Sequence, residues 1–312
     1  MKAVLQYRAA PGFCTRLHAL TGLRVTVVDE ADKETFARAM VDAEVLLHAL
    51  EPVTAAAIAA APRLRLIQKI GVGVNTIDLE AAKRHGVAVC NMPGTNTQAV
   101  AEMTVLLMLA ILRRVTTLEA LTRAGQGWMP PLDMVDALGE LGGRTVGLVG
   151  LGAVGRRLVA ILQGFGARVV YTARQAYADV GIPFRPLPAI LPEVDILSLH
   201  LPLTTETARL IDSAALAAMK PGAILVNTAR GGLVDEAALH AALTSGRLAA
   251  AGLDVFDREP VLPSNPLLAL PNVVVTPHLS WLTAETLDRS LGIIAENCRR
   301  LECGEALLHR VV

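Results

Sequence analysis

Three side chains with complementary chemistry stand in separate segments of the chain: Arg230, Glu259 and His278. A planar guanidinium grips a carboxylate through two parallel hydrogen bonds and polarises a neighbouring carbonyl. An imidazole gives or takes the proton of a hydroxyl or carbonyl oxygen near neutral pH, and a carboxylate beside it fixes its tautomer. The three residue types together predict acid–base chemistry on the oxygen of a substrate that also carries a carboxylate.

Each of these residues also has an ordinary structural interpretation. Arg230 could be a solvated charge in a turn, Glu259 a loop acid before a proline, and His278 a cap of the final helix. The functional interpretation is favoured because a nucleotide-binding turn precedes all three in the chain. The other histidines lack a comparable setting and are interpreted as structural: His18, His48, His85, His200, His240 and His309.

The nucleotide-binding turn is the glycine-rich run GLGAVG at 150–155, which follows a strand-like stretch and opens a helix-like one. In such a turn the first glycine makes the tight bend, the second lets the backbone approach the pyrophosphate, and the third allows close packing of helix and sheet. Amide groups at the helix N-terminus hold the phosphates. We therefore predict that a dinucleotide binds at Gly150, Gly152, Ala153, Val154 and Gly155.

The end of the following strand indicates which dinucleotide is used. NAD-binding chains usually carry an acid about 20 positions after the turn, bonded to the ribose 2′-hydroxyl. Thr172 and Arg174 stand there instead, and a hydroxyl with a guanidinium suits a 2′-phosphate. The sequence predicts NADP(H) in preference to NAD(H), and use of both cofactors is left open. The alternative is that Arg174 simply faces water. Methyltransferases with the same turn usually carry an acidic residue at this position. Because none is present, a methyltransferase is the least favoured of the functions considered.

The elements that must position these residues alternate between strands and helices. In the first hundred residues we expect strands at 3–7, 24–28, 44–49, 64–70 and 87–91, with helices between them. A long helix at 96–122 and a connection at 125–143 lead to strands at 145–149, 168–172, 194–200, 223–228, 249–255 and 273–276, and to a final helix at 284–302. This alternation predicts an α/β fold with parallel sheets covered on both faces. The carboxyl ends of such strands line the ligand crevice, so the three polar segments are expected to converge there.

Composition narrows the class of protein further. The 312 residues are 53% apolar and carry 29 basic and 29 acidic side chains, without a basic patch interleaved with aromatics, so no nucleic-acid partner is expected. The four cysteines show no metal-ligand spacing, which predicts reduced thiols and no metal site. The N-terminus lacks an apolar signal core, and the longest apolar stretch, 103–112, is too short to span a bilayer. We therefore expect a cytoplasmic protein without membrane association.

The chain resembles the D-isomer-specific 2-hydroxyacid dehydrogenase family over essentially its whole length. The resemblance is carried by GVGVNTID at 71–78, NMPGTN at 91–96, AVAE at 99–102, the glycine turn, and the segments around Arg230, Glu259 and His278. The spacing of the last three residues suits the Arg–Glu–His arrangement of that family. The resemblance implies a Rossmann dinucleotide-binding domain at 97–280, including a dimerisation helix, inserted into a flavodoxin-like substrate domain at 1–96 and 281–312.

The resemblance also implies roles for individual residues. The backbone amides of Val72 and Gly73 would join Arg230 in holding the substrate carboxylate, and Asp254 would face the nicotinamide carboxamide. The helix after Asn96 and its loop would build a homodimer, and Trp128 would either reach the active site of a neighbouring subunit or have a simple packing role. Further contacts with the cofactor are expected from Leu201, Pro202, Thr228, Ala229, His278 and Ser280.

Related enzymes of the superfamily can be distinguished at a few positions of the chain. Formate dehydrogenases carry Gln where Glu259 stands, so that activity is not expected. The chain ends ten residues after Glu302, so we do not expect the regulatory domain of long phosphoglycerate dehydrogenases. The strand ending in Thr172 and Arg174 resembles NADPH-linked glyoxylate/hydroxypyruvate reductases. We therefore predict reduction of a small 2-oxo acid to the D-2-hydroxy acid with NAD(P)H.

Trp281 is the residue that indicates an alternative function. An indole at its position resembles the C-terminal-binding-protein corepressors, so the alternative is a dinucleotide-sensing binding protein. In an enzyme, Trp281 would line the substrate pocket, where it would either favour a bulkier 2-oxo acid or merely close the pocket.

Overall fold

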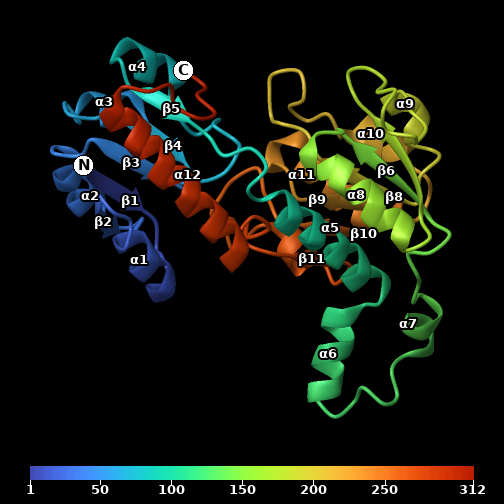
Figure 1. Ribbon diagram of the computed structural model, residues 1–312. Coiled ribbons are helices and arrows are strands. Elements are labelled where there is room, and N and C mark those ends of the chain that lie inside the picture. Colours follow the sequence, from blue (N-terminus) through green and yellow to red (C-terminus); the bar gives the residue numbers. More distant parts are fainter. The chain divides into compact units, whose positions relative to one another are not determined.

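The computed structural model describes residues 1–312 and divides into two compact units (Figure 1). The first unit comprises Met1–Asn96 and Leu282–Val312, and the second comprises Thr97–Trp281. Every paired strand runs parallel to its neighbour in a five-stranded and a six-stranded sheet, which confirms the expected fold class. None of the helices combines the length and the apolar character that a membrane crossing requires.

The sheet of the first unit has the strand order β2-β1-β3-β4-β5, which is that of flavodoxin-like folds. Its strands are β1 (Lys2–Gln6), β2 (Arg24–Val28), β3 (Val45–His48), β4 (Leu66–Lys69) and β5 (Ala88–Cys90). Strands β3 to β5 are buried along their whole length, as expected for parallel strands covered on both faces. The helices of this unit are α1 (Pro11–His18), α2 (Lys33–Met40), α3 (Ala55–Ala59), α4 (Leu79–Arg84) and α12 (Ala284–Cys303).

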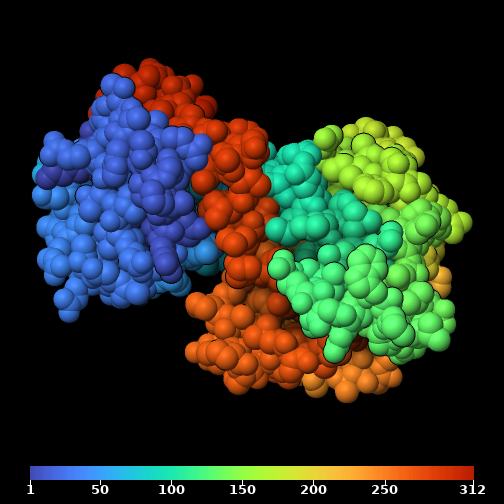
Figure 2. All heavy atoms as spheres, turned by 90° about the horizontal axis from the view of Figure 1, so that it is seen from below, coloured from blue at the N-terminus to red at the C-terminus, as the bar shows by residue number.

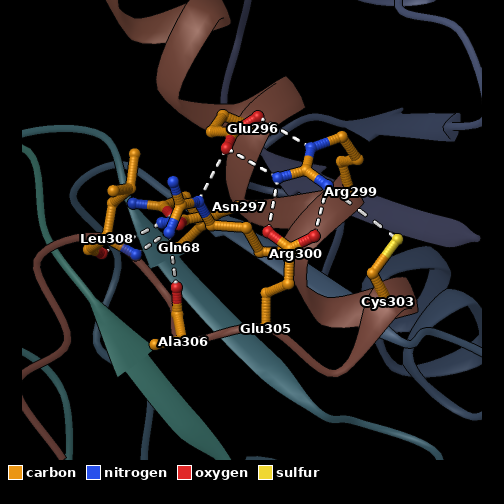
Figure 3. A network of polar contacts seen from close by, with 9 residues as sticks. All are labelled: Gln68, Glu296, Asn297, Arg299, Arg300, Cys303, Glu305, Ala306 and Leu308. Carbon is orange, nitrogen blue, oxygen red and sulfur yellow. Dashed lines mark hydrogen bonds and ion pairs between the residues drawn. The ribbon is translucent and has the colours of Figure 1, made fainter.

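Polar contacts fix the C-terminal segment to the first unit (Figure 3). The side chain of Asn297 on α12 is fully buried; its Nδ2 donates to Oε1 of Gln68 on β4 over 2.7 Å, and its Oδ1 accepts from the amide of Leu308 over 2.7 Å. Arg299 forms two hydrogen bonds with the carboxylate of Glu305, of 2.7 and 2.6 Å. A bridge then pairs the last residues antiparallel to β5. The end of the chain is therefore part of the first unit.

The sheet of the second unit has the order β11-β10-β9-β8-β6-β7. Its strands are β6 (Thr145–Val149), β7 (Arg168–Thr172), β8 (Ile196–Leu199), β9 (Ala223–Asn227), β10 (Leu248–Leu253) and β11 (Val273–Val275). An isolated parallel bridge between Tyr171 and Phe184 extends the sheet beyond β7. With that bridge the order on both sides of β6 matches the Rossmann fold, whose strand order reverses beside the first strand.

Alternate residues of these strands enter two different hydrophobic clusters. Ile196 and Ile224 pack with helices α5 (Thr97–Leu112) and α8 (Ala153–Gly164). Leu197 and Leu225 point the other way and pack with residues of α9 (Leu187–Ile190), α10 (Ser213–Ala218) and α11 (Glu236–Thr244). Side chains alternate across a strand, so both faces of the sheet are buried. Two short 3-10 helices also belong to this unit, η1 (Gly231–Leu233) and η2 (Pro266–Ala269).

The expectation of one continuous helix at 96–122 is wrong. Helix α5 ends at Leu112, Arg114 has a φ of 47°, and α6 (Val115–Arg123) and α7 (Leu132–Asp136) follow. Most of α5 is buried, whereas neither α6 nor α7 buries a residue. The helical pattern of the sequence continues through the break. It does not predict the break, because helix propensity is a weak signal where the chain leaves the core. Residues 113–138, here called the arm, extend from the second unit in Figure 1 and face the viewer in Figure 2.

Candidate active site

The glycine turn lies between β6 and α8, and the backbone geometry explains two of its glycines. Gly150 has a φ of 99°, and a Cβ there would lie 2.5 Å from the carbonyl oxygen of His200. A Cβ on Gly155 would lie 2.5 Å from the carbonyl oxygen of Gly150. Gly152 faces open space, and no side chain caps the start of α8. The first amides of α8 therefore stay available for phosphate groups.

Thr172 and Arg174 lie at the carboxyl end of β7, next to the glycine turn. Thr172 is buried and Arg174 is exposed. Arg156 on α8 pairs with Asp179 at 2.8 Å and lies 4.9 Å from the centre of the Tyr177 ring, so its guanidinium is held in place. No acidic side chain stands at the end of β7, where a ribose 2′-hydroxyl would require one.

The turn after β9 presents Arg230. The buried side chain of Asn227 shapes this turn: its Nδ2 donates to the carbonyl of Arg230 over 2.9 Å and its Oδ1 accepts from the amide of Ala229 over 3.0 Å. The guanidinium of Arg230 donates to the carbonyl of Ala229 over 2.6 Å. Burial lowers the pKa of Arg230, and the negative charge of Glu259 opposes this effect. The group remains a cation at neutral pH, because guanidinium ionisation lies far above that range.

Glu259 and His278 form the central pair of the site. Nδ1 of His278 lies 2.6 Å from Oε2 of Glu259, and Oε1 of Glu259 accepts from the amide of Phe256 over 2.9 Å. Burial raises the pKa of Glu259, but the hydrogen bond and charge of His278, the Phe256 amide and the charge of Arg230 together hold it below its ordinary value. An ionised Glu259 orients Nδ1–H toward itself and leaves Nε2 for proton transfer.

A close backbone approach joins the Arg230 segment to the Glu259 segment. A Cβ added to Gly231 would lie 1.8 Å from the carbonyl carbon of Phe256 and 2.3 Å from the amide nitrogen of Asp257. Only glycine allows these two backbones to pack directly on one another. The contact fixes Arg230 relative to the loop that carries Glu259.

The other expected cofactor residues also lie at the carboxyl ends of the second sheet. Leu201 and Pro202 follow β8, Thr228 and Ala229 follow β9, Asp254 follows β10, and Ser280 comes after β11. The hydroxyl of Ser280 is buried without a hydrogen-bond partner, as expected of a group that meets a polar ligand.

The expected substrate residues are divided between the units. Trp281 is buried in the second unit, and its Nε1 donates to the carbonyl of His278 over 3.1 Å. Val72 and Gly73 follow β4 in the first unit, directly after Gly71, whose φ is 130°. The second unit by itself therefore brings together Arg230, Glu259 and His278.

Sequence reasoning missed three residues that support this trio: Asn227, Gly231 and Thr276. Asn227 orders the Arg230 turn, Gly231 admits the neighbouring loop, and the hydroxyl of Thr276 donates to Asp254 over 2.6 Å. A polar residue at the end of an apolar run that forms a strand is a sequence signal for Asn227 and Thr276. No pattern in the sequence points to the partner of Gly231.

The comparisons with known proteins agree with this geometry. Residues 105–280 match the family model "D-isomer specific 2-hydroxyacid dehydrogenase, NAD binding domain". The chain is 44% identical over 246 residues to a glyoxylate reductase from Aeropyrum pernix, covering 76% of this chain and 73% of the relative. It belongs to the D-isomer-specific 2-hydroxyacid dehydrogenase family.

Two further comparisons bear on the particular activity. A D-3-phosphoglycerate dehydrogenase from Mycobacterium tuberculosis is 42% identical over 288 residues, which are 91% of this chain but 54% of the relative, so the chain spans about half the length of that protein. The solved structure of an NADPH-dependent glyoxylate/hydroxypyruvate reductase from Sinorhizobium meliloti, in complex with NADP and malonate, has a TM-score of 0.85 and 30% identity, covering 100% of this chain and 96% of that one.

Proposed function

We propose that this protein reduces a small 2-oxo acid of the glyoxylate or hydroxypyruvate type to the D-2-hydroxy acid with NAD(P)H. The proposal depends on one observation. His278 and Glu259 form a pair with 2.6 Å between Nδ1 and Oε2, in the same unit as the glycine turn. Arg230 is near enough to influence the ionisation of Glu259. The glyoxylate reductase and the S. meliloti reductase support the substrate class.

The residues present fit a dinucleotide. The glycine turn and the open start of α8 would hold the pyrophosphate, and the unpartnered hydroxyl of Ser280 would meet the nicotinamide end, together with Thr228 and Ala229. When bound, the reduced nicotinamide supplies a hydride to the carbonyl carbon of the substrate.

Each residue of the trio has a separate task in this reaction. Arg230 binds the substrate carboxylate and polarises the adjacent carbonyl, and the amides of Val72 and Gly73 are proposed to bind the same carboxylate. Nε2 of His278 donates its proton to the carbonyl oxygen as negative charge develops there. Glu259 stabilises the imidazolium before this transfer. In this proposal residues 97–280 form the dinucleotide-binding domain, including the dimerisation helix, and residues 1–96 with 281–312 form the substrate domain.

A panel of 2-oxo acids tests the proposal. Glyoxylate, hydroxypyruvate, pyruvate, phenylpyruvate and 3-phosphohydroxypyruvate would each be offered with NADPH and with NADH. We expect the highest kcat/KM for glyoxylate or hydroxypyruvate. A clear preference for 3-phosphohydroxypyruvate would contradict the proposal and favour the D-3-phosphoglycerate dehydrogenase activity for which the mycobacterial relatives are named. Dinucleotide binding without turnover of any acid would favour a dinucleotide-sensing protein.

We also propose that NADP(H) is the preferred cofactor, because Arg174 is exposed at the end of β7 and no carboxylate competes for the ribose. Arg174→Ala should raise the KM for NADPH about tenfold, the loss of one charge-assisted hydrogen bond, and leave the KM for NADH unchanged. Initial rates with both cofactors measure this. Arg168→Ala, at the opposite end of the same strand, is the matched control. An equal effect on both cofactors would contradict the proposal.

The arm is proposed to form a homodimer in the cytoplasm, a compartment that suits the free thiols of this chain. Trp128 is 91%, Met129 89% and Leu132 81% exposed, an apolar surface that a soluble monomer would rarely leave uncovered. The double variant Trp128→Asp, Met129→Asp should sediment as a monomer where the wild type sediments as a dimer. Val41→Asp, at an exposed apolar residue of the first unit, is the control. A monomeric wild type would refute this assembly.

A further inference from the structure

The backbone at His278 has a conformation that needs support. His278 has a φ of 55°, in the left-handed region that side chains other than glycine seldom adopt. Such a conformation persists where the surrounding structure holds it in place. The direction of the imidazole toward Glu259 depends on it, because the side chain follows the backbone of its own residue.

The buried carboxylate of Asp254 gathers the turn around His278. Its Oδ1 accepts from the hydroxyl of Thr276 over 2.6 Å and from the amide of Leu279 over 3.0 Å. Its Oδ2 accepts from the amide of Ser280 over 2.9 Å. The backbone carbonyl of Asp254 also accepts from the amide of His278 itself over 2.7 Å. One fully buried residue therefore holds the chain on both sides of His278.

Asp254 and Thr276, whose side chains are hydrogen-bonded, lie at the ends of two neighbouring strands. Asp254 directly follows β10 and Thr276 directly follows β11, and the amide of Thr276 donates to the carbonyl of Leu253 over 2.9 Å. Asp254 and Thr276 are thus fixed by the sheet, whereas residues 277–280 are loop. The hydroxyl of Thr276 is the one side-chain donor among these contacts to the carboxylate; the others are amides.

We propose that Asp254 and Thr276 are positioning residues, which hold the His278 turn so that the imidazole meets Glu259 and presents Nε2 to the substrate. The proposal rests on the function proposed above. It gives Asp254 a task within the protein in addition to the expected contact with the cofactor. Without the Thr276 hydroxyl the carboxylate can rotate, and the amides of Leu279 and Ser280 lose their fixed acceptor.

The test compares Thr276→Val, which removes the hydroxyl and keeps the shape, with Thr276→Ser, which keeps the hydroxyl. We expect Thr276→Val to lower kcat about ten- to a hundredfold, since the lost hydrogen bond involves a charged group, with a small change in the KM for the 2-oxo acid. Thr276→Ser should retain kcat within about threefold. Thr244→Val, which removes an exposed hydroxyl bonded to the carbonyl of His240 on α11, should behave as wild type.

A second measurement does not depend on turnover. Hydrogen exchange of the Leu279 and Ser280 amides, followed by NMR with and without dinucleotide, should be faster in Thr276→Val than in Thr276→Ser. Unchanged kcat together with unchanged exchange would overturn the proposal. A weaker dinucleotide Kd with kcat intact would make the pair a cofactor contact instead. If the wild type reduced no 2-oxo acid, the proposed function would fail, while the exchange rates would still decide whether Thr276 holds the turn.

Discussion

His278→Ala should lower kcat for the 2-oxo acid by about 10²–10⁴-fold, the usual contribution of a general acid, while the dinucleotide Kd stays nearly constant. The imidazole is the one group of the trio that can deliver a proton. Glu259 is an ionised acceptor, hydrogen-bonded to Nδ1 of His278, and Arg230 cannot give up a proton near neutral pH. The glycine turn and β7, which are proposed to hold the dinucleotide, are not altered by this change.

Steady-state kinetics and fluorescence titration with dinucleotide measure the two effects separately. Glu259 stays ionised near neutral pH, because its pKa is held below the ordinary value, so the variant loses the imidazole and keeps the carboxylate. His18→Ala, at an exposed histidine of α1, is the control. Turnover within a few fold of wild type would remove His278 from the mechanism.

Gly231→Ala should have the second large effect, a loss of kcat/KM of about a hundredfold or more together with a fall in stability of about 3 kcal/mol. The added methyl would meet the carbonyl carbon of Phe256 at 1.8 Å, far inside contact distance, and the obstacle is backbone rather than a movable side chain. The loop at 256–259 must therefore shift, which separates Glu259 from Arg230 and from His278.

Chemical denaturation and the kinetics of the same preparation measure both effects. Gly164→Ala is a matched control, because a Cβ at this residue of α8 meets nothing within 4 Å and alanine favours helix. We expect this control to be as stable as the wild type or slightly more stable. A Gly231→Ala variant with full activity would show that the two loops are not rigidly joined.

Much of the fold follows from local patterns in the sequence. The strands of both sheets are short apolar runs with helices between them, and the glycine run follows its strand directly, so element type and the parallel sheets could be predicted. Arg230, Glu259 and His278 could be selected because each follows a strand, and parallel strands end at a shared edge.

Other features depend on contacts that periodicity does not encode. The break at Arg114 interrupts a sequence that continues to favour helix, and its φ of 47° is set where the chain leaves the core. The bond between Thr276 and Asp254 joins side chains on neighbouring strands, and the approach of Gly231 to Phe256 joins two loops. These pairings appear only when the register and the ends of the strands are fixed in space.

The two tryptophans of the chain differ sharply in environment, which gives the protein a built-in optical probe. Trp128 is 91% exposed on the arm, whereas Trp281 is 8% exposed and donates to the carbonyl of His278. Their emission should resolve into a red-shifted component that an aqueous quencher reaches and a blue-shifted one that it does not. Replacing either indole by phenylalanine would isolate the other, so that one signal reports on the arm and the other on the turn that carries His278.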